Sequence, residues 1–438
     1  MTVCPALMIS APASGQGKTS VTAAIARHAR NAGKKVRVFK TGPDYLDPMV
    51  LERASGAPVY QLDLFMGGLE HCRALLAEAA QGPEGADLIL VEGVMGLYDG
   101  APSSADLAEA FGLPVLAVID AGGMAQTFAA LALGLQQYGR GRIRLCGVVA
   151  NRVGSEAHGR MVAEGLPEDL PLVAALQRRQ DLALPERHLG LVQALELPRL
   201  DAQLDDWAQA WGAATRGFEF QPVDFSEHAD APALPPLLAG RRIGIARDAA
   251  FSFIYPANLD CLRALGAELH FFAPIEGQGL PPDCDALWLP GGYPELHGPA
   301  LRANPRFFAG LREHLAMGRP LLAECGGMLA LAVSLEDAEG REHAMAGLLP
   351  GHARLNKRLA GLGLQAITWP EGELRGHTFH YSSFETPLAP IARASNPNGG
   401  KAAEALYQQG PLRASYLHHY FPSNPQAVAA FFLNTTTP

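Results

Sequence analysis

Short apolar runs alternate with longer amphipathic stretches through the first half of the chain. Runs that are apolar on both faces are typical of parallel strands covered by helices. They lie at 6–10, 36–40, 87–92, 114–120 and 145–151. Between the first two runs, residues 20–32 carry apolar side chains along one stripe and are followed by Gly33, which predicts a helix. Repeated strand–helix units predict an α/β fold with a doubly wound parallel sheet.

The second half repeats this alternation after an interruption. Residues 223–239 are rich in Pro, Ala and acidic residues, and we interpret them as a linker between a domain at 1–222 and a second α/β domain at 240–438. Beyond the linker, the pattern predicts helices at 258–265 and 307–317. It predicts strands at 242–246, 269–273, 286–290 and 320–324.

Composition narrows the class of protein. The 438 residues exceed one ordinary core, which favours two or three domains. Hydrophobic residues form 48% of the chain and charged residues 18%, which excludes a disordered chain, and the net charge of -9 argues against coating nucleic acid. No apolar run is long enough to span a membrane, and no signal-peptide pattern is present. Six scattered cysteines include no C-x-x-C pair. We therefore expect a cytoplasmic protein with no nucleic-acid or membrane partner.

A phosphate-binding loop follows the first predicted strand, where residues 10–19 read SAPASGQGKT. Its small residues, which let backbone N–H groups approach phosphates, are Ser14, Gly15 and Gly17. Lys18 can reach the outer phosphates of ATP, and the Thr19 hydroxyl can bind Mg²⁺. Pro12 stands where the standard pattern has its first glycine. The alternative, a Gly/Ser turn before an ordinary helix, is less favoured because G-K-T at this position is a specific signal.

Charged residues also end the next two strands. Lys40, Asp44 and Asp47 follow the second strand, and Glu92 ends the third. Ligands of this fold class bind at the carboxyl edge of the sheet, so we assign Lys40 to ATP and predict that Asp44, Asp47 and Glu92, with the P-loop threonine, bind Mg²⁺. Each carboxylate taken alone can equally be a solvated loop charge. Asn151 ends the fifth strand and is a weaker candidate for contacting the nucleotide.

A second constellation indicates a cysteine nucleophile. Residues 321–328 read LLAECGGM, which places Cys325 at a sharp turn between a strand and a helix. Such a turn exposes the side chain, and the following helix N-terminus favours the thiolate. Upstream, Gly291 and Gly292 follow another predicted strand and can supply backbone N–H groups for an oxyanion hole. The alternative is a buried structural cysteine, the usual state of an isolated one.

The base of this site is expected from two adjacent histidines in the segment 414–420, ASYLHHY. Only one of His418 and His419 should face the cysteine, because side chains alternate along a strand, and we prefer His418. Tyr420 stands two residues after His418. His377 and His380 lie in a further motif, and each can contact substrate, link the domains or simply pack.

Together these motifs give the chain a family resemblance. It resembles cobyrinic acid a,c-diamide synthase and its counterpart, hydrogenobyrinic acid a,c-diamide synthase, over nearly its full length. The matching segments are APASGQGKTS, FKTGPDYLDP, VEGVMGLYDG, NRVG, LPERHLGLVQA, LPGGYPEL, AECGGM, RGHTFHYS and ASYLHHYF. The resemblance implies an N-terminal P-loop domain like that of dethiobiotin synthetase and a C-terminal α/β glutamine amidotransferase domain of class I-like type.

The resemblance also implies a reaction. L-Glutamine is hydrolysed at Cys325 through a thioester, with His418 as base. ATP phosphorylates a corrinoid side-chain carboxylate with the help of Mg²⁺, and ammonia displaces the phosphate to form an amide, at both the c and the a acetate side chains. Glutaminases of this general class often have an acid two residues after the histidine, where this chain has Tyr420. The family match assigns Tyr45, Leu46, Tyr98 and Asp99 to the corrinoid substrate. A homodimer is compatible with it.

Four other functions fit all or part of the chain. A nickel-sirohydrochlorin a,c-diamide synthase shares every motif, whereas the adenosylcobyric acid synthase branch fits FKTGPDYLDP and LPERHLGLVQA less well. A regulatory or partitioning P-loop ATPase explains only the first domain and has no use for Cys325. A binding module with a degenerate glutaminase fold is disfavoured by the intact cysteine and histidine. The sequence does not decide whether the ring of the substrate carries cobalt.

Overall fold

The computed structural model divides into two compact units, 1–231 and 232–438, and each is described by itself. The described residues are 2–81, 85–179, 184–187, 190–215, 218–227, 233–399 and 403–434. The predicted segment LPERHLGLVQA lies partly outside them. No helix within these ranges is both long and apolar enough to cross a membrane.

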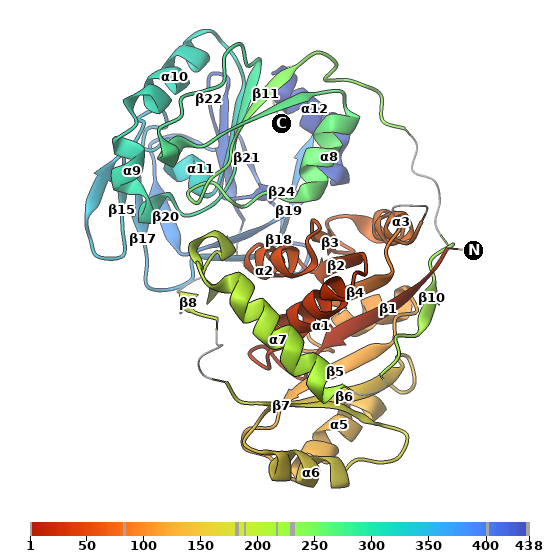
Figure 1. Cartoon of the computed structure of the whole chain (residues 1–438). Helices are drawn as coiled ribbons and strands as arrows, with labels where there is room; N and C mark the ends of the chain where they lie inside the picture. Colours follow the sequence, from red (N-terminus) through yellow and green to blue (C-terminus); the bar gives the residue numbers. More distant parts are fainter. Residues whose placement is uncertain are drawn as a thin grey trace. The chain divides into compact units, whose positions relative to one another are not determined.

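The N-terminal unit is built on a parallel sheet in the order β3-β2-β4-β1-β5-β6-β7 (Figure 1). Its strands are β1 (Val3–Ser10), β2 (Val36–Thr41), β3 (Tyr60–Leu62), β4 (Leu88–Glu92), β5 (Val115–Asp120), β6 (Leu145–Val153) and β7 (Leu172–Gln177). A short antiparallel strand, β10 (Pro222–Asp224), pairs with the start of β1, so the first residues of the predicted linker belong to this sheet. The two-residue strands β8 (Glu186–Arg187) and β9 (Gly190–Leu191) pair with each other.

Helices cover both faces of this sheet, as the doubly wound prediction requires. They are α1 (Lys18–Asn31), α2 (Leu46–Ser55), α3 (Gly68–Ala80), α4 (Ser104–Ala110), α5 (Thr127–Tyr138), α6 (Glu156–Glu164) and α7 (Leu200–Ala214). Because side chains alternate along a strand, Leu7 and Ile9 of β1 pack in one core with α1, α2 and α7, while Met8 packs in the other core with α3, α4 and α5. The predicted fold class is confirmed.

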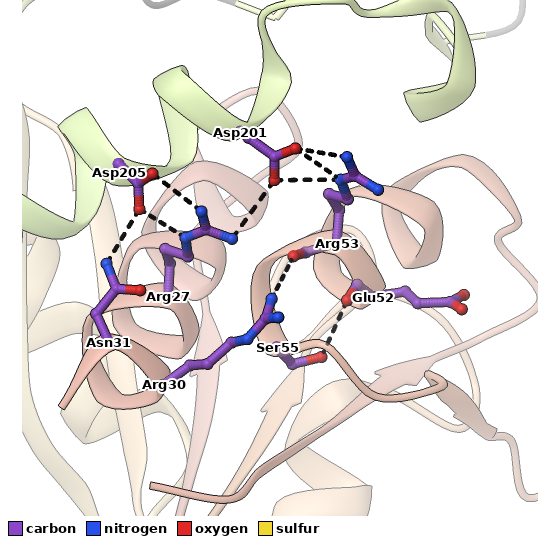
Figure 2. Close-up of polar contacts among 8 residues, drawn as sticks. All are labelled: Arg27, Arg30, Asn31, Glu52, Arg53, Ser55, Asp201 and Asp205. Carbon is purple, nitrogen blue, oxygen red and sulfur yellow. Dashed lines mark hydrogen bonds and ion pairs between the residues drawn. The ribbon is translucent and has the colours of Figure 1, made fainter. Parts of the chain in front are cut away.

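Helix α7 is tied to α1 and α2 by ion pairs (Figure 2). Arg27 of α1 binds Asp205 through Nε at 2.7 Å and reaches Asp201 through a terminal nitrogen at 3.5 Å. Arg53 of α2 donates from Nε to Asp201 at 3.0 Å and 3.1 Å. Helix α1 begins next to the phosphate loop, and α2 begins in the Asp44–Asp47 segment. Both helices are therefore attached to α7.

The C-terminal unit is built on a mixed sheet in the order β12-β11-β13-β14-β23-β22-β21. Its strands are β11 (Arg242–Ala246), β12 (Glu268–Phe272), β13 (Ala286–Leu289), β14 (Leu321–Glu324), β21 (Ala392–Arg393), β22 (Ala405–Gln409) and β23 (Leu412–Ser415). The strands β12, β11, β13, β14 and β23 pair in parallel with their neighbours. Strand β22 pairs antiparallel with β23, and β21 pairs antiparallel with β22. The helices are α8 (Pro256–Ala264), α9 (Gly298–Arg302), α10 (Pro305–Ala316), α11 (Gly326–Leu329) and α12 (Pro425–Leu433).

Two smaller sheets complete this unit, and the sequence patterns did not predict them. One has the order β16-β15-β17-β20 and consists of β15 (Ser334–Glu336), β16 (Glu342–Ala344), β17 (His352–Leu355) and β20 (Ser382–Glu385). The other has the order β18-β19-β24 and consists of β18 (Gly361–Trp369), β19 (Gly372–His380) and β24 (His418–His419). This second sheet brings the 375–382 motif beside the late histidines.

Candidate active site

The phosphate loop runs from the end of β1 to the first residue of α1. Gly15 and Gly17 have φ of 77° and 93°, which favour glycine. A Cβ atom on Gly17 would also collide with the side-chain nitrogen of Asn151, whose amide donates to Gln16 O at 2.9 Å. Asn151, predicted to contact the nucleotide, therefore also fixes the shape of the loop that binds its phosphates.

Lys18 lies folded over this loop. Its Nζ donates to Met95 O at 2.6 Å and to Ala13 O at 3.2 Å. Burial lowers the pKa of Lys18, and the neighbouring Lys40 lowers it further, whereas Glu92 opposes the shift. Carbonyl oxygens and the nearby carboxylate together hold this ammonium group at the phosphate loop.

Lys40 is the centre of a buried charge cluster. Its Nζ lies 3.2 Å from Glu92, 3.2 Å from Asp44 and 3.5 Å from Asp47. Burial alone would lower the pKa of Lys40, but the three carboxylates raise it on balance, so the side chain carries its charge. Burial raises the pKa of Asp47 to about 7, against the opposing pull of Lys40. The structure thus brings together the four charged residues predicted at these strand ends.

Of the four residues predicted to bind Mg²⁺, Thr19 and Glu92 contact each other. The Thr19 hydroxyl donates to one oxygen of Glu92 at 3.1 Å, while the other oxygen is buried without a hydrogen-bond partner among the described residues. Asp44 and Asp47 instead contact Lys40 directly. In the described ranges, no group of three His, Cys, Asp or Glu side chains could hold a metal by itself. A Mg²⁺ ion that takes most of its ligands from phosphates and water fits Thr19 and Glu92.

A cavity of about 420 Å³ lies beside the loop, and sequence reasoning missed the residues that form it. Arg152 takes a left-handed φ of 59°, binds Asp120 at 2.6 Å and donates to Gly15 O at 3.0 Å. Burial opposes ionisation of Asp120, but the N–H of Gly122 and then Arg152 lower its pKa on balance. The cavity is lined by Gln16, Asp120, Gly122, Gly123, Met124, Arg152 and Arg178. The sequence signal for this cavity is that Arg152 directly follows Asn151, which was predicted to contact the nucleotide.

The four residues assigned to substrate occupy two places. Tyr45 and Leu46 begin α2, between Asp44 and Asp47 of the Lys40 cluster. The Tyr98 hydroxyl donates to Leu135 O of α5 at 2.6 Å, and Asp99 accepts from the N–H of Gly96 at 3.0 Å within its own turn. Tyr98 and Asp99 therefore make structural contacts in their own loop and with α5.

Cys325 lies at a strained elbow between β14 and α11, with φ of 44° and ψ of -109°. Two glycines follow because there is no room for side chains. A Cβ on Gly326 would lie 2.7 Å from Gly292 O, and one on Gly327 would collide with Leu289 O. The elbow is thereby pressed against the Gly291–Gly292 loop, as an oxyanion hole requires.

The imidazole of His418 packs on the same loop. A Cβ on Gly291 would collide with the His418 ring, and the Phe253 ring lies 6.0 Å away. Burial, followed by the neighbouring His377 and His380, lowers the pKa of His418 well below its usual value. A neutral imidazole next to the elbow can accept the thiol proton.

The adjacent His419 points elsewhere. Its Nδ1 lies 2.7 Å from Glu324 and its backbone N–H donates to the same oxygen at 2.9 Å. The indole of Trp288 donates to the second oxygen of Glu324 at 2.9 Å. This alternation supports the choice of His418, because the other histidine is held in a buried polar network behind the nucleophile.

The surroundings of Cys325 add residues that sequence reasoning missed. Burial raises the pKa of the Cys325 thiol, and the nearby Glu295 raises it further. Glu295 is itself 8% exposed, and burial raises its pKa to about 7. The thiol therefore needs a base to become nucleophilic. Glu295 stands in the segment LPGGYPEL, which was singled out only for its glycines.

Two family models match the chain. The model of the CobB/CobQ-like glutamine amidotransferase domain matches residues 242–426, which include Gly291, Cys325 and His418. The model of the CobQ/CobB/MinD/ParA nucleotide binding domain matches residues 7–192, which include the phosphate loop and Glu92.

Similar proteins match over almost their full length. A hydrogenobyrinate a,c-diamide synthase of Stutzerimonas stutzeri is 58% identical over 98% of this chain and 98% of its own. One from Pseudomonas aeruginosa is 57% identical over 98% of this chain and 97% of its own. A cobyrinate a,c-diamide synthase of Herminiimonas arsenicoxydans is 52% identical over 97% of this chain and 96% of its own.

Proposed function

The chain belongs to the hydrogenobyrinate and cobyrinate a,c-diamide synthase family, and from this premise we propose that it amidates the a and c acetate side chains of a corrinoid in cobalamin biosynthesis. It is an ATP-dependent, glutamine-hydrolysing amidoligase. We place the reaction in the cytoplasm, with ATP, L-glutamine and the corrinoid as substrates.

The proposed glutaminase step uses the elbow. His418 takes the proton of the Cys325 thiol, and the thiolate attacks the amide carbon of glutamine. The N–H groups of the Gly291–Gly292 loop stabilise the oxyanion. Collapse of the tetrahedral intermediate breaks the carbon–nitrogen bond, and His418 returns the proton so that ammonia leaves. Water then hydrolyses the thioester and releases glutamate.

The proposed ligase step uses the phosphate loop. A corrinoid carboxylate attacks the γ-phosphorus of ATP, ADP leaves, and an acyl phosphate forms. Lys18 offsets the charge that develops on the phosphates, and Thr19 with Glu92 would hold Mg²⁺. The Mg²⁺ ion would neutralise phosphate charge. Ammonia then attacks the acyl carbon and expels phosphate, leaving the amide.

One observation carries this proposal: Cys325 and His418 both pack on the Gly291–Gly292 loop, in a chain whose other unit holds Lys18 and Glu92 around a phosphate loop. We expect Cys325→Ala to abolish amide formation from glutamine and to retain it with ammonium chloride. We expect Lys18→Ala to abolish product from both nitrogen sources. Mass spectrometry of the corrinoid measures each result. Glutamine-dependent product from Cys325→Ala would refute the glutaminase assignment.

The ring substrate is tested separately. The purified enzyme is given ATP, Mg²⁺ and glutamine with hydrogenobyrinic acid, cobyrinic acid or nickel-sirohydrochlorin in turn. We expect doubly amidated product from a corrinoid. Product from nickel-sirohydrochlorin alone would replace the corrinoid proposal with the nickel-tetrapyrrole alternative.

A further inference from the structure

Strands β19 and β24 bring two histidines face to face. In their antiparallel pairing, His377 stands directly opposite His418, and the two rings stack with centroids 5.0 Å apart and planes 17° apart. Directly opposed residues of neighbouring strands project from the same face of a sheet, which is why the rings meet. Both side chains are buried, so solvent does not compete for this contact.

His377 is itself held by a buried tyrosine. The Tyr255 hydroxyl and His377 Nδ1 lie 3.0 Å apart. The Tyr255 ring packs edge-on against Tyr420, with centroids 5.5 Å apart. Tyr420 stands two residues after His418, where related glutaminases place an acid. Tyr420 therefore occupies the position of that acid, and it packs on Tyr255. The Tyr255 hydroxyl in turn pairs with His377, whose ring stacks on His418.

We propose that His377, fixed by Tyr255, is a positioning residue that orients the His418 base through ring stacking in place of a triad carboxylate. The inference rests on the proposed glutaminase function. The carboxylate nearest to the nucleophile in sequence, Glu324, binds His419 and Trp288 and is committed to the other side of β24.

Stacking orients the base without taking part in proton transfer. In the acylation step the proton passes from the Cys325 thiol to His418 and then to the departing ammonia, while His377 keeps its own protons. A triad acid fixes the ring of its histidine and stabilises the imidazolium. A parallel aromatic ring restricts the same rotation, but it does not stabilise the imidazolium, because burial and the neighbouring histidines favour the neutral ring.

The test compares two variants of the full chain. His377→Ala removes the ring, whereas His377→Phe keeps a ring to stack on and removes the nitrogens. We expect His377→Ala to lower kcat for glutamine hydrolysis by about 10- to 100-fold, no more than the lower end of what loss of a general base costs, because His418 itself remains, and to change KM by less than about threefold. We expect His377→Phe to recover most of kcat.

The pH profile separates positioning from simple packing. Among the described residues, the titratable groups that act on the pKa of His418 include His377 and His380 of β19 and the adjacent His419. Burial and the neighbouring histidines lower the pKa of His418. Removing the His377 ring relieves both effects, so the acidic limb of kcat/KM for glutamine should move to higher pH in His377→Ala.

Two controls keep the outcome interpretable. Ammonia-driven amide formation should be unchanged in every variant, because it does not use the elbow. His314→Asn, which removes a buried histidine of α10, should retain glutaminase activity.

Tyr255→Phe, which deletes one hydroxyl, should lower kcat by a smaller factor than His377→Ala. Unchanged kcat in His377→Ala, a rise in KM alone, or an equal loss in His377→Phe would each overturn the proposal. A wild-type chain without glutaminase activity would instead refute the proposed function.

Discussion

Cys325 and Glu295 are neighbouring ionisable groups for which burial disfavours the charged form. In the proposed mechanism, the thiol gains its reactivity when His418 removes its proton. Glu295 makes no ion pair with any described residue, and a buried carboxylate without a cation costs stability when it ionises. The consequence at the scale of one residue is a pH-dependent stability.

Glu295→Gln should therefore stabilise the protein at high pH only. The pKa of Glu295 is raised to about 7, above its unfolded value near 4.5, so the cost of burial appears as pH rises above 4.5 and is complete above about 7. At about pH 8.5 the variant should be more stable by up to roughly 3 kcal/mol, and at about pH 4.5 nearly unchanged. Urea unfolding at both pH values measures this, and an equal difference at both would contradict it.

Helix α7 shows how an element outside the site can support it. Its carboxylates bind Arg27 of α1 and Arg53 of α2, and these two helices start at the phosphate loop and at the Lys40 cluster (Figure 2). The apolar face of α7 packs on α1 through Leu204 and Trp207. Packing provides most of the attachment, and the ion pairs set the register of the three helices.

Asp205→Asn tests the ionic part of this attachment. The carboxylate accepts two hydrogen bonds from Arg27, at 2.7 Å and 2.9 Å, but it is half exposed. We expect a loss of about 0.5–1 kcal/mol in unfolding free energy that shrinks in about 1 M NaCl, because salt screens exposed charges. Asp206→Asn, one residue along the same helix, should change stability by less than about 0.5 kcal/mol. A salt-independent loss would assign the effect to packing.

At the scale of the whole molecule, the proposed reaction requires one chain to supply both the ammonia and the acyl phosphate that the ammonia attacks. Free ammonia is mostly protonated near neutral pH and is diluted when it escapes into solvent. A fused pair of activities keeps it concentrated and nucleophilic.

Mixing two inactive variants measures this advantage. Lys18→Ala retains the elbow, and Cys325→Ala retains the phosphate loop. At dilute enzyme, the mixture with glutamine should form product after a lag and at least about tenfold more slowly than the wild type, because ammonia must cross bulk solvent. Added ammonium chloride should remove the lag. An immediate wild-type rate would show that ammonia exchanges freely.

The features that could be predicted from the sequence are those set by residues that are adjacent in the chain. The strand–loop–helix at SGQGKT, the elbow at AECGG and the strands β1, β2, β4, β5, β6 and β11 to β14 were read correctly because each follows from local periodicity or from the backbone demands of a few adjacent residues. The remaining strands of the two large sheets, β3, β7, β21, β22 and β23, were not predicted. The sheet of β15, β16, β17 and β20 was missed because each of its strands has only three or four residues, so its pattern is weak. The nine-residue strands β18 and β19 were also missed.

Only the tertiary structure showed which residues that are distant in the sequence contact each other. The pairing of Lys40 with Glu92, of His419 with Glu324 and of His377 with His418 joins residues 41 to 95 positions apart. Strand order and register set these contacts, and neither is encoded in local periodicity. The sequence by itself predicted the two chemistries, most of the residues expected to perform them and the preference for His418 over His419. Only the tertiary structure showed that His419 binds Glu324 and that His418 stacks on His377, because these contacts depend on the register of β24.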